Sequence, residues 1–279
     1  MTTDEDEDPM QRPDALTGWD DEHNAELYDR FTREHTFYTD ASRDLAARAG
    51  LTGMQLVIDL CGGTGVTAAV LLDSLPTHGR VISLDSATAM QAVGRRHRDH
   101  PRITWITAKA EDLADHISTP ADAVICNSAI WKTNTTAVFA AVHHVLRPGG
   151  QFVFNIGGRF AGLTDREPPT TASLNDLITA IAVADYDYIP PQQKRRPSFT
   201  AAILRTQLRA AGFATVTTDV VTRTGTLEEK RAWLSIPLFA RPPGQLTHTQ
   251  RMNILHKAYE QVDKTRQVTT RWLLVTAQA

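Results

Sequence analysis

The stretch Val57–Leu75, VIDLCGGTGVTAAVLLDSL, constrains the fold more than any other part of the chain. A short apolar run that contains an acid passes directly into a glycine cluster, and the apolar residues then take helical spacing. Glycines at the junction of a strand and a helix allow a tight turn and the close approach of a ligand to the backbone. The helix expected from Val66 adds unsatisfied N–H groups and a partial positive charge. This stretch therefore predicts a strand, a ligand-binding loop and a helix.

Strand and helix patterns alternate on both sides of this loop. The helices are expected at 66–75, 86–97 (with Ser86 as its cap), 135–146 and 198–212, and the strands at 55–60, 80–85, 102–108, 122–127, 151–156, 214–222 and 270–278. Such alternation predicts parallel strands joined by right-handed crossovers, with helices on both faces. Ligands of such sheets bind beyond the carboxyl ends of the strands.

The remaining segments frame one predicted domain over residues 21–279. Residues 1–20 form an acidic tail, expected to be disordered, and 21–50 a cover of two helices, the second from near Asp40 or Ser42 to Gly50. Regular patterning lapses over 157–197, where one helix at 173–184 stands between proline-rich flanks. This insertion after the fifth strand is interpreted as a lid, with a plain stabilising excursion as the alternative.

Composition and charge exclude several classes of protein. The chain has 42% hydrophobic and 22% charged residues and a net charge of −3, values of a globular protein without a nucleic-acid footprint. No apolar run is long enough to span a bilayer, and two cysteines make a disulfide framework implausible. The absence of a signal-peptide pattern favours the cytoplasm. The basic run Arg95–Arg98 is interpreted as a solvated helix end, and Lys194–Arg196 is left open.

The acids around the glycines separate the possible ligands. Gly63-x-Gly65-x-x-Ala68 fits the pattern for NAD, but Asp59 just before it would crowd a pyrophosphate and suits an ammonium group. A Walker loop for ATP would need Gly-Lys-Ser/Thr, which is absent here. Asp85, at the end of the next strand, can accept hydrogen bonds from both hydroxyls of a ribose. After the third strand, a carboxylate of AEDL can accept from an adenine amino group, so these residues favour a nucleoside with a cationic end.

In this order the motifs resemble those of class I S-adenosylmethionine-dependent methyltransferases of the small-molecule type. VIDLCGGTG is similar to their first motif, VISLDSATAM to the acidic second strand, AEDL to the adenine-side motif, DAVICNSAIW to the fourth strand and LRPGGQFVFNI to the turn and fifth strand. The resemblance implies an α/β, Rossmann-like, seven-stranded, mostly parallel sheet. One departure is Cys61, which stands where the family usually has glycine.

The resemblance also implies roles for individual residues. Asp59 would lie near the methionine ammonium and Asp85 at the ribose, and Asn127 and Ser128 would line the sulfonium side. The cofactor-binding set is Tyr38, Asp59, Cys61, Gly62, Gly63, Gly65, Asp85, Ser86, Glu111, Asp112, Asn127 and Ser128. The substrate pocket is expected from Tyr28, Trp131, Arg159, Phe160, Tyr186 and Tyr188. His35 is the candidate base, ahead of His143 and His144, and no metal is expected.

The resulting prediction is transfer of a methyl group from S-adenosylmethionine to an oxygen, nitrogen or carbon atom of a small organic acceptor. Secondary metabolism is the expected context, by analogy at the level of the fold. No nucleic acid or membrane partner is expected, and an oligomer is possible. An NAD-dependent oxidoreductase and a cofactor-binding protein that does not methylate are the alternatives.

Overall fold

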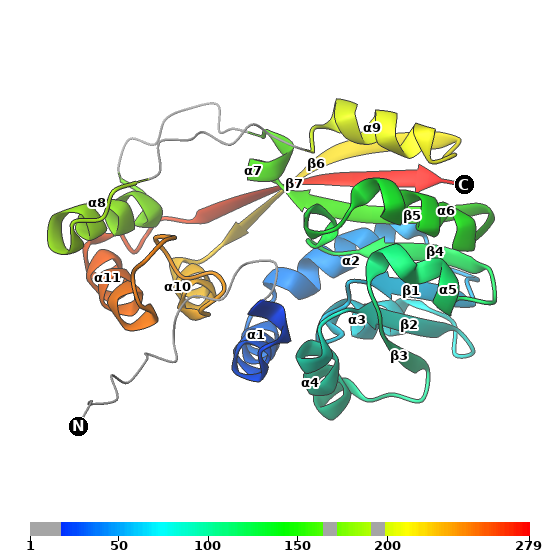
Figure 1. Ribbon diagram of the computed structural model, residues 1–279, viewed down its shortest axis with the longest axis horizontal. Coiled ribbons are helices and arrows are strands. Elements are labelled where there is room, and N and C mark those ends of the chain that lie inside the picture. Colours follow the sequence, from blue (N-terminus) through cyan, green and yellow to red (C-terminus); the bar gives the residue numbers. More distant parts are fainter. Residues whose placement is uncertain (1–17, 164–171, 191–198) are drawn as a thin grey trace, which may run out of the picture. The chain divides into compact units, whose positions relative to one another are not determined.

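A single seven-stranded sheet with the strand order β3-β2-β1-β4-β5-β7-β6 organises the computed structural model (Figure 1). The structure describes residues 18–163, 172–190 and 199–279. The strands are β1 Leu56–Leu60, β2 Arg80–Asp85, β3 Ile103–Thr107, β4 Ala121–Cys126, β5 Leu146–Gly157, β6 Thr215–Gly225 and β7 Val268–Gln278. The first five pair in parallel, and β7 runs antiparallel to β5. The predicted Rossmann-like α/β sheet is thereby confirmed.

The chain divides into two compact units, each with its own helices. The larger unit holds the sheet with α1 Glu22–Glu34, α2 Phe37–Ala49, α3 Val66–Ser74, α4 Thr88–Arg98, α5 Leu113–His116, α6 Thr135–Val145, α7 Gly158–Ala161, α9 Ala201–Ala210 and the short 3-10 turns η2 Ala110–Asp112 and η3 Ile130–Lys132. The smaller unit holds α8 Leu174–Tyr186, α10 Leu227–Ser235 and α11 His248–Gln261; the turn η1, Gly18–Asp20, spans the boundary between the units.

The smaller unit joins two segments that the sequence did not link. Apolar residues of α8, from the insertion after β5, pack with α10 and α11, from the segment between β6 and β7, around Ile178, Leu234 and Ile254. Most of the predicted tail lies outside the described residues, and so does the whole of the basic run Lys194–Arg196. The single domain over 21–279 and the lid stay predictions.

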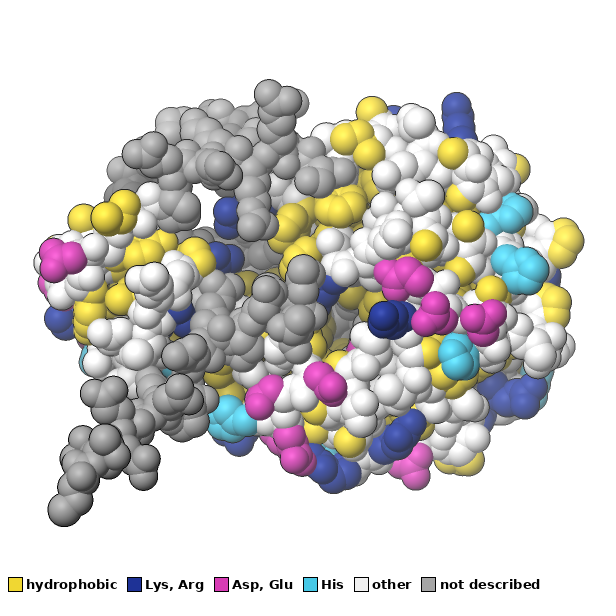
Figure 2. Space-filling view, viewed as in Figure 1, with side chains coloured by type: hydrophobic (Ala, Val, Ile, Leu, Met, Phe, Trp, Pro, Cys, Tyr) yellow, Lys and Arg dark blue, Asp and Glu magenta, His cyan; other side chains and the backbone are white. Residues whose placement is uncertain are grey.

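Charged side chains of both signs are interspersed on the face of the molecule seen in Figure 2. No helix within the described ranges is long and apolar enough to cross a membrane. Both observations agree with a sequence that lacks long apolar runs and strong net charge.

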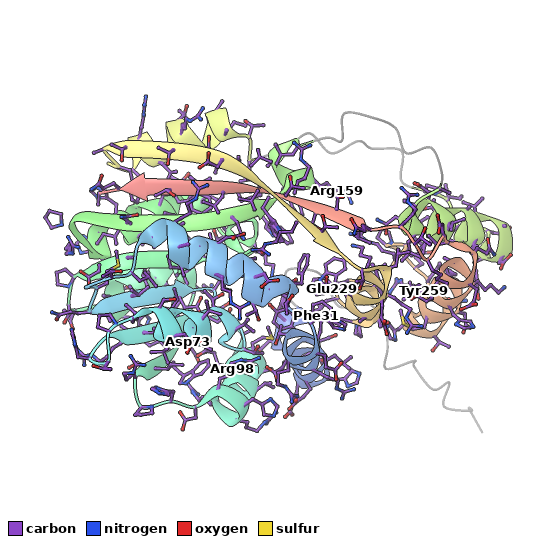
Figure 3. The ribbon with its side chains drawn as sticks, turned by 180° about the vertical axis from the view of Figure 1, so that it is seen from behind. Phe31, Asp73, Arg98, Arg159, Glu229 and Tyr259 are labelled. Carbon is purple, nitrogen blue, oxygen red and sulfur yellow. The ribbon has the colours of Figure 1, made fainter. Side chains whose placement is uncertain are left out.

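Helices cover both faces of the sheet. On one face α6 and α9 pack against Ile58, Phe152 and neighbouring residues, and on the other α2 and α3 pack against alternate residues such as Val57 and Ile125. The second face, with α1, α2 and α4, is seen in Figure 3. Alternate residues of one strand point to opposite faces, and burial of both faces explains why these strands are almost continuously apolar.

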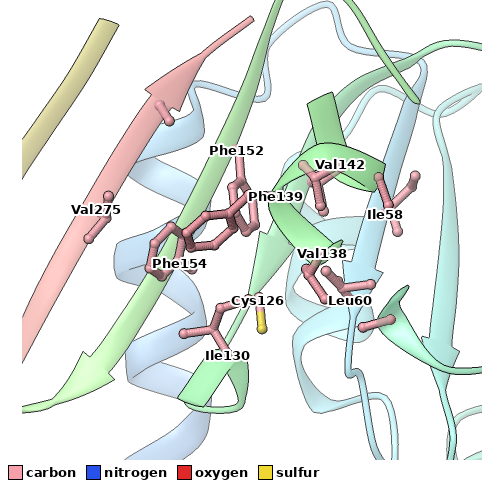
Figure 4. Packing of buried hydrophobic residues seen from close by; sticks show 14 of the residues in the cluster. Ile58, Leu60, Cys126, Ile130, Val138, Phe139, Val142, Phe152, Phe154 and Val275 are labelled. Atoms are coloured by element: carbon pink, nitrogen blue, oxygen red, sulfur yellow. The ribbon is translucent and has the colours of Figure 1, made fainter. Parts of the chain in front are cut away.

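Aromatic side chains fill the space under α6. Phe139 of α6 lies with ring centroids 5.9 Å from Phe152 and 5.8 Å from Phe154, and all three side chains are fully buried (Figure 4). Cys126, at the end of β4, is buried in the same cluster. This core fixes the carboxyl ends of β1 and β4, where the loops of the candidate site begin.

Two helix starts differ from the sequence prediction. The second helix begins at Phe37, not near Asp40 or Ser42, while Gly50 ends it in the expected left-handed conformation, with φ of 62°. The helix after β2 begins at Thr88, and Ser86 does not cap it, because Ala87 is the capping residue. In neither helix does the capping residue, Thr36 or Ala87, form a side-chain capping hydrogen bond.

Candidate functional site

Asp59, near the end of β1, holds the start of α3. Its Oδ2 accepts a hydrogen bond from the Ala68 N–H at 3.0 Å, and the side chain is buried. Burial raises the pKa of Asp59 to about 7; the nearby Asp85 also raises it, and the bonds from Ala68 and Ser83 act in the opposite direction. The glycine loop therefore lies over a buried carboxyl group that titrates near neutral pH.

Asp85, at the end of β2, binds the glycine loop directly. Its Oδ2 accepts from the Gly63 N–H at 2.9 Å, and its Oδ1 accepts from the Ala87 N–H at 2.8 Å. The Gly62 N–H donates to the Leu84 carbonyl at 3.1 Å, so β2 holds two successive loop residues. Burial raises the pKa of Asp85, against the bonds from Ala87 and Gly63.

The glycines of the loop are required by both conformation and space. Gly63 and Gly65 have φ of 56° and 80°, in the left-handed region that favours glycine. A Cβ at Gly65 would lie 2.4 Å from the Trp105 ring, and one at Gly62 would lie 2.4 Å from Ser83 Oγ and 2.5 Å from Asp59 Oδ2. A side chain at Gly62 or Gly65 would therefore require the neighbouring side chains or the loop to shift.

Cys61 also adopts the left-handed conformation, with φ of 56°. The position at which the sequence departs from the glycine pattern is thus one whose backbone favours glycine. Its side chain is half-buried and packs against the core that contains Cys126. The neighbouring Cys126 thiol and burial raise the pKa of Cys61.

A polar cluster follows β4. The Asn127 amide donates to Ser42 Oγ at 3.0 Å and to the Tyr38 carbonyl at 3.2 Å. Asn127 Oδ1 accepts from Ser128 Oγ at 2.9 Å and from Asn155 Nδ2 at 3.0 Å. The Ser128 N–H donates to Asn155 Oδ1 at 2.6 Å. These bonds tie α2, the loop after β4 and β5 together, so three of the predicted cofactor residues meet here.

The two acids predicted on the adenine side, Glu111 and Asp112, differ in their contacts. Glu111 Oε1 accepts from the Asn134 N–H at 2.7 Å, which links η2 to the residue that caps α6. Asp112 and Ser86 are both exposed. Of the two acids in AEDL, Glu111 thus has a structural bond, and Asp112 presents its carboxylate to solvent.

An aromatic pair lies beside the polar cluster. Trp131 of η3 and Phe160 of α7 stack with ring centroids 4.4 Å apart and an angle of 14° between the planes. The Trp131 indole N–H donates to the Ser128 carbonyl at 3.0 Å, which fixes the ring relative to the cluster. Arg159, next to Phe160, is exposed on α7 (Figure 3). The structure thus brings together two of the predicted pocket residues.

Tyr28 and Tyr38 come from the two amino-terminal helices and lie with ring centroids 5.2 Å apart. Tyr28 is predicted in the substrate pocket, but its surroundings include the acids of the glycine loop. Burial and the adjacent Tyr38 raise the pKa of Tyr28, Arg98 lowers it, and Asp59 and Asp85 raise it further. Tyr28 thus lies on the side of the glycine loop.

The other predicted residues lie in varied settings. His35 follows α1, and its half-buried ring packs on Phe31 with centroids 4.8 Å apart. Tyr186 and Tyr188 belong to the smaller unit and pack against its apolar cluster. His143 packs on Phe213 with centroids 5.2 Å apart, a structural contact. Within the described ranges, no cluster of His, Cys, Asp or Glu is arranged to hold a metal ion.

Sequence reasoning missed two residues at this edge of the sheet. Asn155 is a buried polar residue within the apolar strand QFVFNI, and that break in the pattern could have pointed to it. Lys132 ends η3; burial lowers its pKa to about 8, while Asp85, Cys61 and Cys126 act in the opposite direction. The sequence carried no signal for Lys132, because its neighbours come from three separate strand ends.

Comparison with known proteins agrees with this arrangement. Residues 57–150 match the family described as "Methyltransferase domain". Trans-aconitate 2-methyltransferase of Azoarcus sp. is 30% identical over 133 residues, which cover 47% of this chain and 48% of that protein. The 2-phytyl-1,4-naphtoquinone methyltransferase of Thermosynechococcus vestitus is 27% identical over 215 residues, 70% of this chain and 89% of that protein.

A similar fold occurs in the plantazolicin methyltransferase BamL, solved with S-adenosylhomocysteine. The two chains share 11% identity and a TM-score of 0.54, with 94% of each chain covered. The matched region of this chain spans about half the length of the Azoarcus relative. A mostly parallel sheet with a glycine loop between two acids at strand ends is the arrangement of a Rossmann-like fold that binds a nucleoside-containing cofactor. The domain match over residues 57–150, the methyltransferase relatives and the strand order together support a class I S-adenosylmethionine-dependent methyltransferase.

Replacement of Cys61 tests the strain in the loop. We expect Cys61→Gly to be more stable than Cys61→Ala by about 1 kcal/mol, because both remove the thiol but only glycine adopts positive φ without steric cost. Urea unfolding of the two variants measures the difference. The same pair at Cys126, inside β4, is the control, and there alanine should be the more stable. Equal stability of the Cys61 pair would contradict the argument.

Burial of Asp59 predicts a dependence of stability on pH. Because its pKa is raised to about 7, the folded state binds a proton more tightly than the unfolded chain, whose value is 3.8. The contribution of Asp59 to the unfolding free energy is therefore full below about pH 4 and is lost as the pH rises through about 7. Urea unfolding at several pH values should show this decline in the native protein but not in Asp59→Asn.

Asp122 is the control for this titration, because its pKa is shifted in the other direction. Although burial raises it, the bonds from Leu56, Arg147 and Gln55 lower the pKa of Asp122 below the usual value. Its contribution is therefore lost as the pH falls, so Asp122→Asn should change stability most at the higher pH values. A decline with pH that survives in Asp59→Asn would assign the titration to another group.

Proposed function

We propose that this chain transfers a methyl group from S-adenosylmethionine to an oxygen, nitrogen or carbon atom of a small organic acceptor, in secondary metabolism. The observation that carries the proposal is the pair of carboxyl groups at the glycine loop. Asp59 accepts from the Ala68 N–H of α3, and Asp85 accepts from the Gly63 N–H of the loop. The match of residues 57–150 to a methyltransferase domain supports the same cofactor.

These two acids argue against NAD as the ligand. A pyrophosphate at the start of a helix needs backbone N–H groups that are available and an environment without negative charge. Here the Gly63 N–H of the loop and the Ala68 N–H of α3 already donate to the carboxyl groups of Asp85 and Asp59. A ligand with an ammonium group and a sulfonium adds positive charge beside the acids, which is electrostatically favourable. The geometry therefore supports S-adenosylmethionine over a dinucleotide.

The surroundings of the loop support a small organic acceptor. The stacked rings of Trp131 and Phe160 offer a flat apolar surface beside the polar cluster of Asn127 and Ser128. We propose that Tyr28 and Arg159 belong to the same pocket, and the assignment of Tyr186 and Tyr188 stays a prediction from the sequence. The named substrates of the two relatives, trans-aconitate and a naphthoquinone, are small organic molecules.

The chemistry proposed for this site depends mainly on position. S-adenosylmethionine, when bound, supplies an activated methyl group, and the protein needs to align the acceptor and exclude water. We propose that Asn127 and Ser128 line the methyl side and that Asp85 and Asp112 bind the ribose and adenine. His35 is the proposed base for an acceptor that carries a proton at the reacting atom. A cytoplasmic location stays a prediction from the sequence.

Transfer of a labelled methyl group tests the proposed function. We expect label from S-adenosylmethionine in at least one acceptor of a panel of phenols, amines, carboxylic acids and carbon acids, together with S-adenosylhomocysteine as product. Occupancy by the cofactor without label in any acceptor would favour a binding protein. Tight binding of NAD with no response to S-adenosylmethionine would favour the oxidoreductase.

Replacement of Asp85 tests the cofactor site. Asp85→Ala should weaken binding of S-adenosylhomocysteine, measured by calorimetry, by about 1.5–3 kcal/mol, the loss expected for hydrogen bonds to a charged group. Asp122 is a matched control, since it also accepts from two backbone N–H groups, those of Gln55 and Leu56, but at the other end of β1. Asp122→Ala should leave the affinity unchanged. If Asp85→Ala binds S-adenosylhomocysteine as tightly as Asp122→Ala does, the assignment of Asp85 to the ribose is refuted.

A further inference from the structure

The basic run at the end of α4, which the sequence presented as a solvated helix end, connects α4 to α1. Arg96 binds Glu22 at 3.1 Å and also Glu26, at the surface. His97 and Arg98 turn instead toward Asp29 of α1. Figure 3 shows Arg98 on α4 on the same face as α1, which carries Phe31. The run therefore has an exposed part and a buried part with different contacts.

Asp29 is a fully buried carboxylate that contacts two arginines and a histidine. Its Oδ2 lies 2.9 Å from Arg33 Nε and 2.6 Å from His97 Nδ1, and its Oδ1 accepts from Arg98 Nη1. Although burial raises it, the bonds and charges of Arg98 and His97 lower the pKa of Asp29 below its usual value. A buried charge with such partners is costly to separate from them.

Arg98 also contacts the glycine loop. Its Nη1 donates to the Thr64 carbonyl at 3.2 Å, and its Nη2 donates to Thr32 Oγ1 of α1 at 2.9 Å. The Gly65 N–H, on the same peptide group as the Thr64 carbonyl, donates to the Gly62 carbonyl at 2.8 Å. One guanidinium group thus joins α1, α4 and the loop peptide between the two glycines with positive φ.

The helix held by these contacts, α1, carries Tyr28, which lies near the acids of the glycine loop. Asp29 follows Tyr28, whose surroundings include the Asp59 and Asp85 carboxyls as well as Arg98. Movement of α1 would therefore change the position of Tyr28 relative to Asp59 and Asp85. The Thr64 peptide would lose one of its two fixed ends at the same time.

We propose that Arg98 is a positioning residue that joins α1 to the glycine loop, through Asp29 on one side and the Thr64 carbonyl on the other, and so sets the affinity of the site for its cofactor. Arg98 acts through the loop and α1 and takes no part in the transfer itself. The fork of an arginine suits this role, since it places several donors at fixed angles.

Arg98→Lys tests the proposal, because lysine keeps the charge near Asp29 but cannot donate to Thr32 and Thr64 in the same geometry. We expect affinity for S-adenosylhomocysteine, measured by calorimetry on the full chain, to fall roughly 5- to 30-fold, as for the loss of one to two hydrogen bonds. Arg96→Lys is the matched control, since Arg96 also binds α1 but not the loop. Its affinity should change less than about 2-fold on the same scale.

Hydrogen exchange distinguishes positioning from general stability without any cofactor. Amide exchange across Glu22–Glu34 should be faster in Arg98→Lys than in Arg96→Lys, while exchange in the central strands stays at the native rate. Unchanged affinity in Arg98→Lys, with only a lower melting temperature, would overturn the proposal. If Arg98→Lys does not fold, Thr32→Val removes one partner of the guanidinium and is expected to lower the affinity in the same direction.

The two readouts also separate this proposal from the cofactor assignment. If the native chain fails to bind S-adenosylhomocysteine, the cofactor assignment fails, and the exchange of α1 still decides whether Arg98 holds the helix. If the native chain binds and the two variants bind equally well, only the role of Arg98 is refuted.

Discussion

The hydrogen bond from the Gly63 N–H to the Asp85 carboxylate connects the loop after β1 to the end of β2, and most of the site depends on it. Asp59, near the end of β1, holds the start of α3 by accepting a hydrogen bond from the Ala68 N–H. At Gly62 and Gly65 the loop has little room for a side chain, because Ser83 and Trp105 fill the space that a Cβ would need. Negative charge under a helix start that otherwise attracts anions makes the loop suitable for a cationic nucleoside cofactor.

The remaining parts of the site stabilise this loop from three directions. From the amino-terminal side, α1 and α4 meet at the buried Asp29 and reach the Thr64 carbonyl through Arg98. The cluster of Asn127, Ser128 and Asn155 fixes the loop after β4. Below them lies the aromatic core under α6, which holds the strand ends in register. A rigid core with polar networks above it is the usual way in which a fold positions a ligand.

Much of this could be predicted from the sequence because it depends on local patterns. Alternating strands and helices, glycines after a strand and acids at strand ends are visible in a single chain, and all seven strands were anticipated. The helix starts at Phe37 and Thr88 were not, since neither helix begins with the side-chain capping hydrogen bond that a sequence pattern would indicate. The smaller unit was missed because α8 packs with α10 and α11 across a long stretch of sequence.

The sheet, the glycine loop and the acids before and after it can be recognised in the sequence alone, because apolar periodicity marks the strands and the glycines mark the turn between strand and helix. The contacts of the individual polar side chains, by contrast, are visible only in the folded chain. Glu111 binds the backbone of Asn134, Arg98 is turned inward while Arg96 stays at the surface, and Cys61 takes a backbone conformation suited to glycine. Such contacts join strand ends and helices that are far apart in the chain, and no local pattern records them.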